Sequence, residues 1–207
     1  MKRLRTPLAG IFAAAALSMA GAAVAAPVDF DVRGVSFNPG NGYGTGFGEL
    51  GVEFNAAGLR QIFSLTNGQS YTFSFGSVTL NEEFGVVNDL ELGGLGVSAR
   101  FNFDDPLNAN RNVSASGTAT LGAISDSAVD LRIDWSDLLV SFDLGQFRIS
   151  MNDLAFTANN QTLTQYATIT LLSGGTPTTN GVPEPASLAL VGGALALMGA
   201  MRRRRQA

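Results

Sequence analysis

The chain has 207 residues, with 13 Lys and Arg against 17 Asp and Glu, and it contains neither Cys nor His. This length allows one domain of ordinary size with a substantial core once terminal segments are set aside. Without His, neither a Ser-His-Asp triad nor an ordinary zinc site can form, and without Cys no disulfide can stabilise the fold.

The first 25 residues have the features of a secretory signal peptide. Three positive charges within residues 1–5 precede an apolar run at residues 8–24, and small residues follow. Cleavage after Ala25 would place Ala23 and Ala25 at the two positions where signal peptidase requires small side chains. We therefore predict a signal peptide at residues 1–25 that directs the chain to the Sec export machinery and is then removed by signal peptidase. The alternative is an uncleaved anchor helix.

The region after the signal peptide is strongly acidic. Residues 26–182 contain six basic and sixteen acidic residues, a net charge of −10. Such a field repels nucleic acid and anionic lipid headgroups and favours cations or neutral partners. We therefore expect no nucleic-acid partner.

Between residues 26 and 175 the hydrophobic pattern repeats every second residue, which predicts half-buried strands. The clearest runs are Tyr71, Phe73 and Phe75; Val97, Ala99, Phe101 and Phe103; Val129, Leu131, Ile133 and Trp135; and Phe147, Ile149 and Met151. Roughly nine to eleven strands are expected, with no long helix before the C-terminal region. The predicted fold class is all-β: an antiparallel β-sandwich, jelly-roll-like or immunoglobulin-like, over residues 26–175.

Turn and glycine signals refine this prediction. Asn67-Gly68 is typical of a type I′ hairpin between the strands on either side of it. The sequence DLGQ at 143–146 predicts a second hairpin. Gly34 and Gly76 lie where a β-bulge would shift the alternation.

Aromatic side chains are the natural candidates for sugar binding. Trp135, the sole tryptophan, continues the inward alternation of Ile133, so we expect it in the core rather than on a sugar-binding surface. Tyr43 and Phe47 lie in the glycine-rich run at 40–48, which predicts a surface loop. We expect both rings to fold back on the sheet; the alternative is that they are exposed and adhesive.

Acidic residues offer candidates for catalysis. Glycoside hydrolysis requires two carboxylates about 5 to 10 Å apart, one of them kept protonated. Alternation along the strand predicts that Asp130 and Asp134 share the solvent face opposite Leu131 and Ile133, where solvated carboxylates are common. We therefore expect no enzyme and predict no catalytic or cofactor-binding residues.

One loop is rich in oxygen donors. Residues 104–110 contain Asp104, Asp105, Asn108 and Asn110, and oxygen is the ligand type that Ca²⁺ prefers. The spacing matches no EF-hand, and loops rich in Asp and Asn often simply form turns. A Ca²⁺ site and an ordinary turn both remain open for this loop.

The C-terminal region differs from the rest of the chain. A linker at 176–185 is followed at 186–201 by sixteen uncharged, mostly apolar residues. As a helix these would span about 24 Å, against a hydrocarbon core of roughly 30 Å, and flanking arginines can snorkel to cover the difference. We predict a transmembrane helix at 186–201 and a basic cytoplasmic tail at 202–207.

The order of these features resembles the PEP-CTERM sorting domain of Gram-negative bacteria. The residues that carry the resemblance are Val182, Pro183, Glu184 and Pro185, then the apolar helix, then Arg202, Arg203, Arg204 and Arg205. The resemblance implies that an exosortase, a membrane protease-transpeptidase, processes the chain near the Pro-Glu-Pro motif and passes it to the cell surface or exopolysaccharide. It covers about 26 of the 207 residues and implies nothing about the region before it.

We therefore expect an exported surface or extracellular-matrix protein with a non-catalytic structural or adhesive role. The alternatives are an exopolysaccharide-binding or other glycan-binding module and, less favoured, a glycosidase-like enzyme. Exposed aromatic side chains would favour the glycan-binding module, since sugars stack on aromatic rings. Two converging carboxylates in a cleft would favour the enzyme, and a closed surface without features would favour the structural role.

Overall fold

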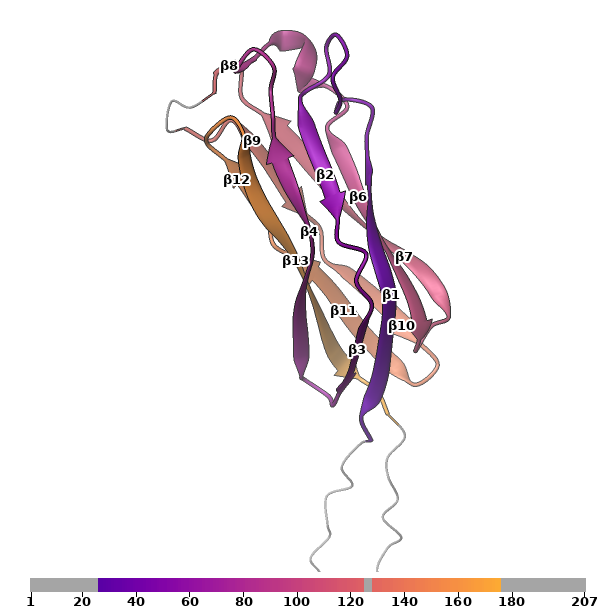
Figure 1. Ribbon diagram of the computed structural model, residues 1–207. Helices are drawn as coiled ribbons and strands as arrows, with labels where there is room; N and C mark the ends of the chain where they lie inside the picture. Colours follow the sequence, from indigo (N-terminus) through magenta and orange to yellow (C-terminus); the bar gives the residue numbers. More distant parts are fainter. Residues whose placement is uncertain (1–25, 125–127, 176–207) are drawn as a thin grey trace, which may run out of the picture. The chain divides into compact units, whose positions relative to one another are not determined.

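The computed structural model, which describes residues 26–124 and 128–175, is all-β (Figure 1). The hydrophobic alternation forms thirteen strands, and the segment at Asp89–Leu92 forms a short 3₁₀ turn, η1. The strands are β1 (Val28–Pro39), β2 (Val52–Ala56), β3 (Gln61–Leu65), β4 (Ser70–Leu80), β5 (Val86–Val87), β6 (Gly96–Asp105), β7 (Ala109–Ala119), β8 (Gly122–Ala123), β9 (Leu131–Trp135), β10 (Leu138–Phe142), β11 (Gly145–Met151), β12 (Leu154–Phe156) and β13 (Gln161–Ser173).

The strands form two large sheets and one small one, and every strand pair is antiparallel. The six-stranded sheet has the order β12-β9-β7-β6-β1-β3, the five-stranded sheet the order β10-β11-β13-β4-β2, and β5 pairs with β8. The prediction of an all-β, antiparallel fold is confirmed. The strand number exceeds the predicted range because the two-residue strands β5 and β8 are too short to show an alternation.

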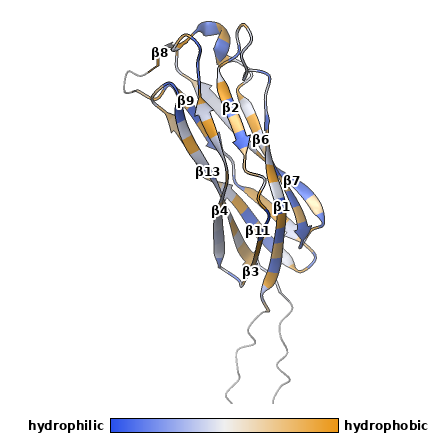
Figure 2. Ribbon diagram, in the orientation of Figure 1, coloured by the Kyte–Doolittle hydropathy of each residue, from blue (hydrophilic) through white to orange (hydrophobic). Residues whose placement is uncertain are grey.

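The two large sheets enclose one apolar core. Phe30 of β1 meets Phe147 of β11 with ring centroids 5.2 Å apart, and Phe75 of β4 meets Phe101 of β6 at 5.8 Å. Figure 2 shows hydrophobic and hydrophilic residues alternating along the strands. Every second residue of β6, from Val97 to Phe103, is buried as predicted, because alternate side chains of a strand point to the same face.

One predicted hairpin is confirmed and the other is wrong. The turn at 143–146 joins β10 and β11, which pair with each other. Asn67 and Gly68 do form a tight turn, with Gly68 at φ 82° and the Gln69 N–H donating to the Thr66 carbonyl at 3.0 Å. However, β3 before this turn pairs with β1, whereas β4 after it pairs with β2 and β13. The turn therefore carries the chain from one sheet to the other.

Both predicted bulges are present. The register between β1 and β6 shifts between Val32 and Gly34. The register between β13 and β4 shifts between Gln165 and Tyr166, opposite the position of Gly76. Each shift lets a long strand keep its apolar side chains on the inner face although the strand curves.

The described chain enters and leaves at the same end of the two sheets (Figure 1). Ala26 and Gly175 lie beside each other there, and both line one shallow hollow. The opposite end is formed by residues 40–51, 81–95 and 117–124, and we call it the loop end.

The predicted signal peptide (1–25), linker (176–185), transmembrane helix (186–201) and basic tail (202–207) lie outside the described residues. Within the part of the chain that the structure describes, no helix is long and apolar enough to cross a membrane.

Candidate functional site

A hollow of about 450 Å³ lies at the loop end. It is lined by residues from 44–51 and 81–84, together with Asn88 and Glu91. We call it the loop-end hollow. Its walls come from the glycine-rich loop, the loop after β4 and the η1 turn, and each of these segments is fixed by its own hydrogen bonds.

Tyr43 anchors the glycine-rich loop. Its hydroxyl donates to the Leu95 carbonyl at 2.7 Å, and its ring is buried against Phe54 with centroids 5.1 Å apart. Burial raises the pKa of Tyr43, so the phenol stays neutral and remains a donor. The predicted inward position of Tyr43 is therefore confirmed.

Glu82 fixes the loop after β4. Its buried carboxylate accepts the Gly51 N–H at 2.7 Å and the Glu83 N–H at 3.1 Å, while its own N–H donates to Asn159 Oδ1 at 2.8 Å. Backbone donors thus compensate the charge of a carboxylate that is almost inaccessible to solvent. This side chain holds the two walls of the loop-end hollow together.

The η1 turn is closed by a capping box. The Glu91 carboxylate accepts the Asn88 N–H at 2.9 Å and also contacts the Asn88 side-chain amide, whose oxygen accepts the Leu90 N–H at 3.0 Å. Both residues that cap the turn also line the hollow. The wall they form is therefore set by local backbone geometry before any ligand arrives.

Phe47 and Phe84 are the two most exposed large apolar side chains in the described residues, at 95% and 81%. Both line the loop-end hollow. The prediction that Phe47 folds back on the sheet is wrong. The Glu49 N–H donates to the Gly46 carbonyl at 3.1 Å and closes a tight turn, and Phe47 occupies the tip of that turn, where its ring points away from the core.

The polar groups of the loop-end hollow are acceptors or neutral. Its lining includes Glu49 and Glu83 but no Lys or Arg. The Glu49 carboxylate accepts the Gly46 N–H at 2.9 Å, whereas the exposed Glu83 side chain extends from a wall of the hollow. A ligand here would contact two aromatic rings, backbone groups of a glycine-rich loop and carboxylate acceptors, a combination that suits neutral or cationic molecules rather than anions.

Trp135 lies in the core, as predicted. Its indole N–H donates to Gln165 Oε1 at 3.1 Å, and the Gln165 amide donates to the Asn152 carbonyl at 2.8 Å. The sole tryptophan is therefore hydrogen-bonded to the buried side chain of Gln165 and is itself too buried to offer its ring face to a sugar.

The predicted arrangement of Asp130 and Asp134 is wrong. Asp134 is partly buried on β9, but Asp130 is only 3% exposed. The backbone ladder continues through Asp130, whose N–H donates to the Phe156 carbonyl at 2.8 Å and whose carbonyl accepts the Thr120 N–H at 2.7 Å. Asp130 is thus covered by neighbouring chain segments on both sides, and the two carboxylates do not share a solvent face.

The loop at 104–110 is a turn whose first carboxylate is already occupied. Asp104 accepts two bonds from the Arg33 guanidinium, at 3.1 Å from Nε and 2.7 Å from Nη2. Asn108 adopts a positive φ of 46° and its N–H donates to the Asp104 carbonyl at 2.9 Å, which closes the loop between β6 and β7. Across residues 26–124 and 128–175, no three acidic side chains gather closely enough to hold a metal ion.

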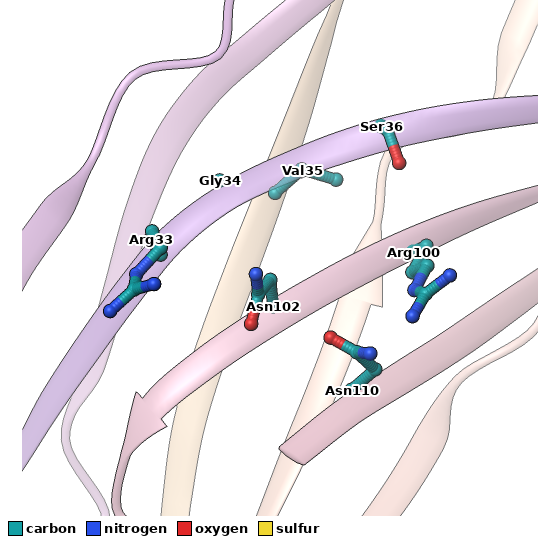
Figure 3. A pocket seen from close by; sticks show the side chains of 7 residues that line it. All are labelled: Arg33, Gly34, Val35, Ser36, Arg100, Asn102 and Asn110. Carbon is teal, nitrogen blue, oxygen red and sulfur yellow. The ribbon is translucent and has the colours of Figure 1, made fainter. Parts of the chain in front are cut away.

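A second hollow, of about 350 Å³, lies on the outer face of the six-stranded sheet (Figure 3). We call it the sheet-face hollow. Sequence reasoning missed it, because its lining comes from strands that are far apart in the chain. The lining residues are Arg33, Gly34, Val35 and Ser36 of β1, Arg100 and Asn102 of β6, and Asn110 of β7.

Comparison of the chain with family models, with curated proteins and with solved structures found no match. Function is therefore inferred from the chemistry of the residues themselves.

Proposed function

We propose that the protein is an exported surface or extracellular-matrix component, sorted through its PEP-CTERM-like tail, whose non-catalytic β-sandwich body adheres to exopolysaccharide through the loop-end hollow. The observation that supports adhesion is the pair of exposed rings, Phe47 and Phe84, on the same hollow. Large apolar side chains that remain in solvent are unfavourable unless a partner covers them.

Chemically, the loop-end hollow suits a sugar. The apolar faces of sugar rings stack on aromatic side chains, while hydroxyl groups donate to carboxylate and backbone acceptors such as Glu83. The walls are fixed in advance by Tyr43, Glu82 and the capping box at Asn88, so ordering them adds little cost to binding.

The loop-end hollow lies far from the last described residue. Gly175, after which the predicted membrane tail follows in sequence, lies at the end of the sheets opposite the loop end. A polymer bound at the loop-end hollow would therefore not contact the residues at which the described chain begins and ends. We also propose that the two facing sheets form a sandwich, jelly-roll-like or immunoglobulin-like, that holds the walls of the loop-end hollow in place.

The test is binding of the full-length protein to the producing organism's own exopolysaccharide, measured by co-sedimentation. The double variant Phe47→Ala/Phe84→Ala should weaken binding roughly tenfold or more, since both stacking surfaces are lost. The control is Ile62→Ala, which removes a side chain that is 69% exposed but lies on β3. Equal binding by the wild type and the double variant would refute the site. Absence of wild-type binding would refute adhesion and leave a purely structural role.

A further inference from the structure

The sheet-face hollow is built from strands brought into register by the bulge in β1. The shift between Val32 and Gly34 places Gly34 opposite Asn102 of β6, and Asn102 is opposite Asn110 of β7. Cross-strand partners point to the same face of a sheet. Gly34, Asn102 and Asn110 therefore form one row across three strands on the outer face, as Figure 3 shows.

A second row lies beside the first. Ser36 of β1 is opposite Arg100 of β6, and Arg100 is opposite Asn112 of β7. Two residues further along a strand correspond to about 7 Å. A guanidinium, a hydroxyl and several side-chain amides thus converge on an area about the size of one sugar ring.

Gly34 leaves the middle of this area open. A Cβ added at Gly34 would meet nothing within 4 Å, and its backbone does not have a positive φ. Glycine is therefore not required there by local backbone strain or by crowding. Its effect is to leave a space between Arg33 at one end of the hollow and Arg100 at the other.

Arg100 supplies the available positive charge. Arg33 is held by the Asp104 carboxylate, and Arg60 and Arg148 pair with Asp31 and Asp137. Arg100 is exposed and forms no ion pair with any residue in the described ranges. In a region with a net charge of −10, this guanidinium remains free for an anionic group of a ligand.

We propose that the sheet-face hollow binds a carboxylate-bearing sugar unit, a uronic acid residue, of an extracellular polysaccharide. Arg100 donates two parallel hydrogen bonds to the carboxylate, a geometry that guanidinium and carboxylate share. The amides of Asn102 and Asn110 and the hydroxyl of Ser36 bind the sugar hydroxyls. This site is separate from the loop-end hollow and does not depend on it.

The lining of the sheet-face hollow favours a uronic acid unit over an acidic peptide or nucleic acid. Val35, the only residue of the lining with a large apolar side chain, is buried, so the hollow exposes no such side chain to pack against the apolar side chains of a peptide. The net negative charge of the surrounding region disfavours polymers as densely charged as nucleic acid. A polysaccharide with at most one carboxylate per sugar carries its charges further apart than duplex nucleic acid does, so the repulsion is weaker and hydrogen bonds to its hydroxyl groups can offset it.

The test uses full-length protein and oligogalacturonate, with the same oligomer carboxyl-reduced to neutral alcohols as the comparison, and measures affinity by calorimetry. We expect the carboxylated oligomer to bind at least about tenfold more tightly than the reduced one and to weaken as salt increases. Equal affinity for the two oligomers, or no binding of either, would overturn the proposal. Inorganic sulfate that competes at the concentration of the oligomer would also overturn it, by assigning the hollow to small anions.

Two variants locate the site. Arg100→Gln should weaken oligogalacturonate binding about tenfold or more, and Gly34→Val, which fills the open space, should do the same without altering charge. The matched control is Arg132→Gln, which removes an exposed arginine from β9 of the same sheet, outside the hollow. An equal loss in Arg132→Gln would show a mere effect of net charge and reject the site. The Phe47→Ala/Phe84→Ala protein should retain oligogalacturonate binding, so the two sites can fail separately.

Discussion

The Tyr43 hydroxyl donates a buried 2.7 Å hydrogen bond to the backbone carbonyl of Leu95, 52 residues further along the chain. The same carbonyl also accepts the Gly117 N–H at 2.8 Å. The carbonyl oxygen of Leu95, in the segment before β6, thus joins that segment both to the glycine-rich loop and to β7. The loop-end hollow depends on this junction, because Tyr43 lies between Gly42 and Gly44 at the base of the glycine-rich loop that forms one wall of the hollow.

Tyr43→Phe should lower the free energy of unfolding by about 1 kcal/mol, the net worth of one buried hydrogen bond, because Leu95 keeps its bond from Gly117. Denaturant titration measures the difference. Burial raises the pKa of Tyr43, so its stabilising contribution is complete below the unfolded-state pKa of about 10 and is lost as pH rises toward the folded-state value. The difference between wild type and variant should therefore shrink above that pH. A constant difference would contradict a buried neutral phenol.

Gly117→Ala should be more damaging. A Cβ at Gly117 would lie 2.2 Å from the Tyr43 hydroxyl oxygen and 2.4 Å from the Leu95 carbonyl oxygen. Overpacking of this kind costs about 1 to 3 kcal/mol. Gly34→Ala is the matched control and should change the melting temperature little, since nothing lies within 4 Å of its added methyl group. If the two variants have the same melting temperature, the packing around the Leu95 carbonyl tolerates a methyl group and the prediction is wrong.

Gln165→Leu tests the buried hydrogen bond between Trp135 of β9 and Gln165 of β13, which joins the two large sheets. The substitution leaves the Trp135 indole N–H and the Asn152 carbonyl without the partners they now have. We expect a loss of about 1 to 3 kcal/mol and a shift in the emission of the sole tryptophan. In a Trp135→Phe background the same change should cost less, because no indole donor remains. Equal costs in both backgrounds would show that the hydrogen bond is not the cause.

Asp31 and Arg60 join β1 to the segment before β3, with Arg60 Nε donating to Asp31 Oδ1 at 2.7 Å. Hydrogen bonding to Arg60 holds the pKa of Asp31 below its usual range, and the charges of Arg60 and Arg33 act in the same direction. The stabilisation is therefore present above the unfolded-state pKa, near 4, and disappears as pH falls through the lower folded-state value.

Asp31→Asn should consequently lower the melting temperature at neutral pH, and its difference from wild type should close below about pH 4. Asp143→Asn removes an exposed carboxylate from the β10–β11 turn and serves as the control, with little effect at either pH. A deficit in Asp31→Asn that persists unchanged in acid would assign the loss to packing rather than to charge.

The alternation of apolar and polar residues predicted the inner faces of most strands, because the burial of every second side chain can be seen in the local sequence. The turn at 143–146 was predictable for the same reason. Asn67-Gly68 shows the limit: these residues determine a positive φ at Gly68, but the sheet that β4 joins is decided by contacts with β13, nearly a hundred residues later.

The candidate sites depend even more on contacts between distant parts of the chain. The sheet-face hollow requires Gly34 to be in register with Asn102, and no local pattern specifies that pairing. Hydropathy alone predicts that Phe47 is buried, yet the turn between Gly46 and Glu49 directs its side chain into solvent. Alternation along the strand predicts that Asp130 is exposed to solvent, yet the segments that contain Thr120 and Phe156 cover it on either side.

The sorting proposal is tested at Glu184. If the apolar run at 186–201 and Arg202–Arg205 retain the chain in the membrane, and the Pro-Glu-Pro motif is what a processing enzyme reads, then retention and processing are separable functions. Glu184→Ala should leave full-length protein in the membrane fraction, while Thr178→Ala in the same linker should be processed normally.

Deleting residues 186–207 should instead release the body as a soluble periplasmic protein that bypasses sorting, because neither the apolar run nor the arginines remain to hold it. Intact-mass measurement of surface-associated wild-type protein should find a species that ends near residue 183 and lacks Arg202–Arg205. Surface protein that still carries those arginines would refute processing and leave a plain membrane anchor. Loss of the arginines in the Glu184→Ala protein as well would show that cleavage occurs without recognition of the motif.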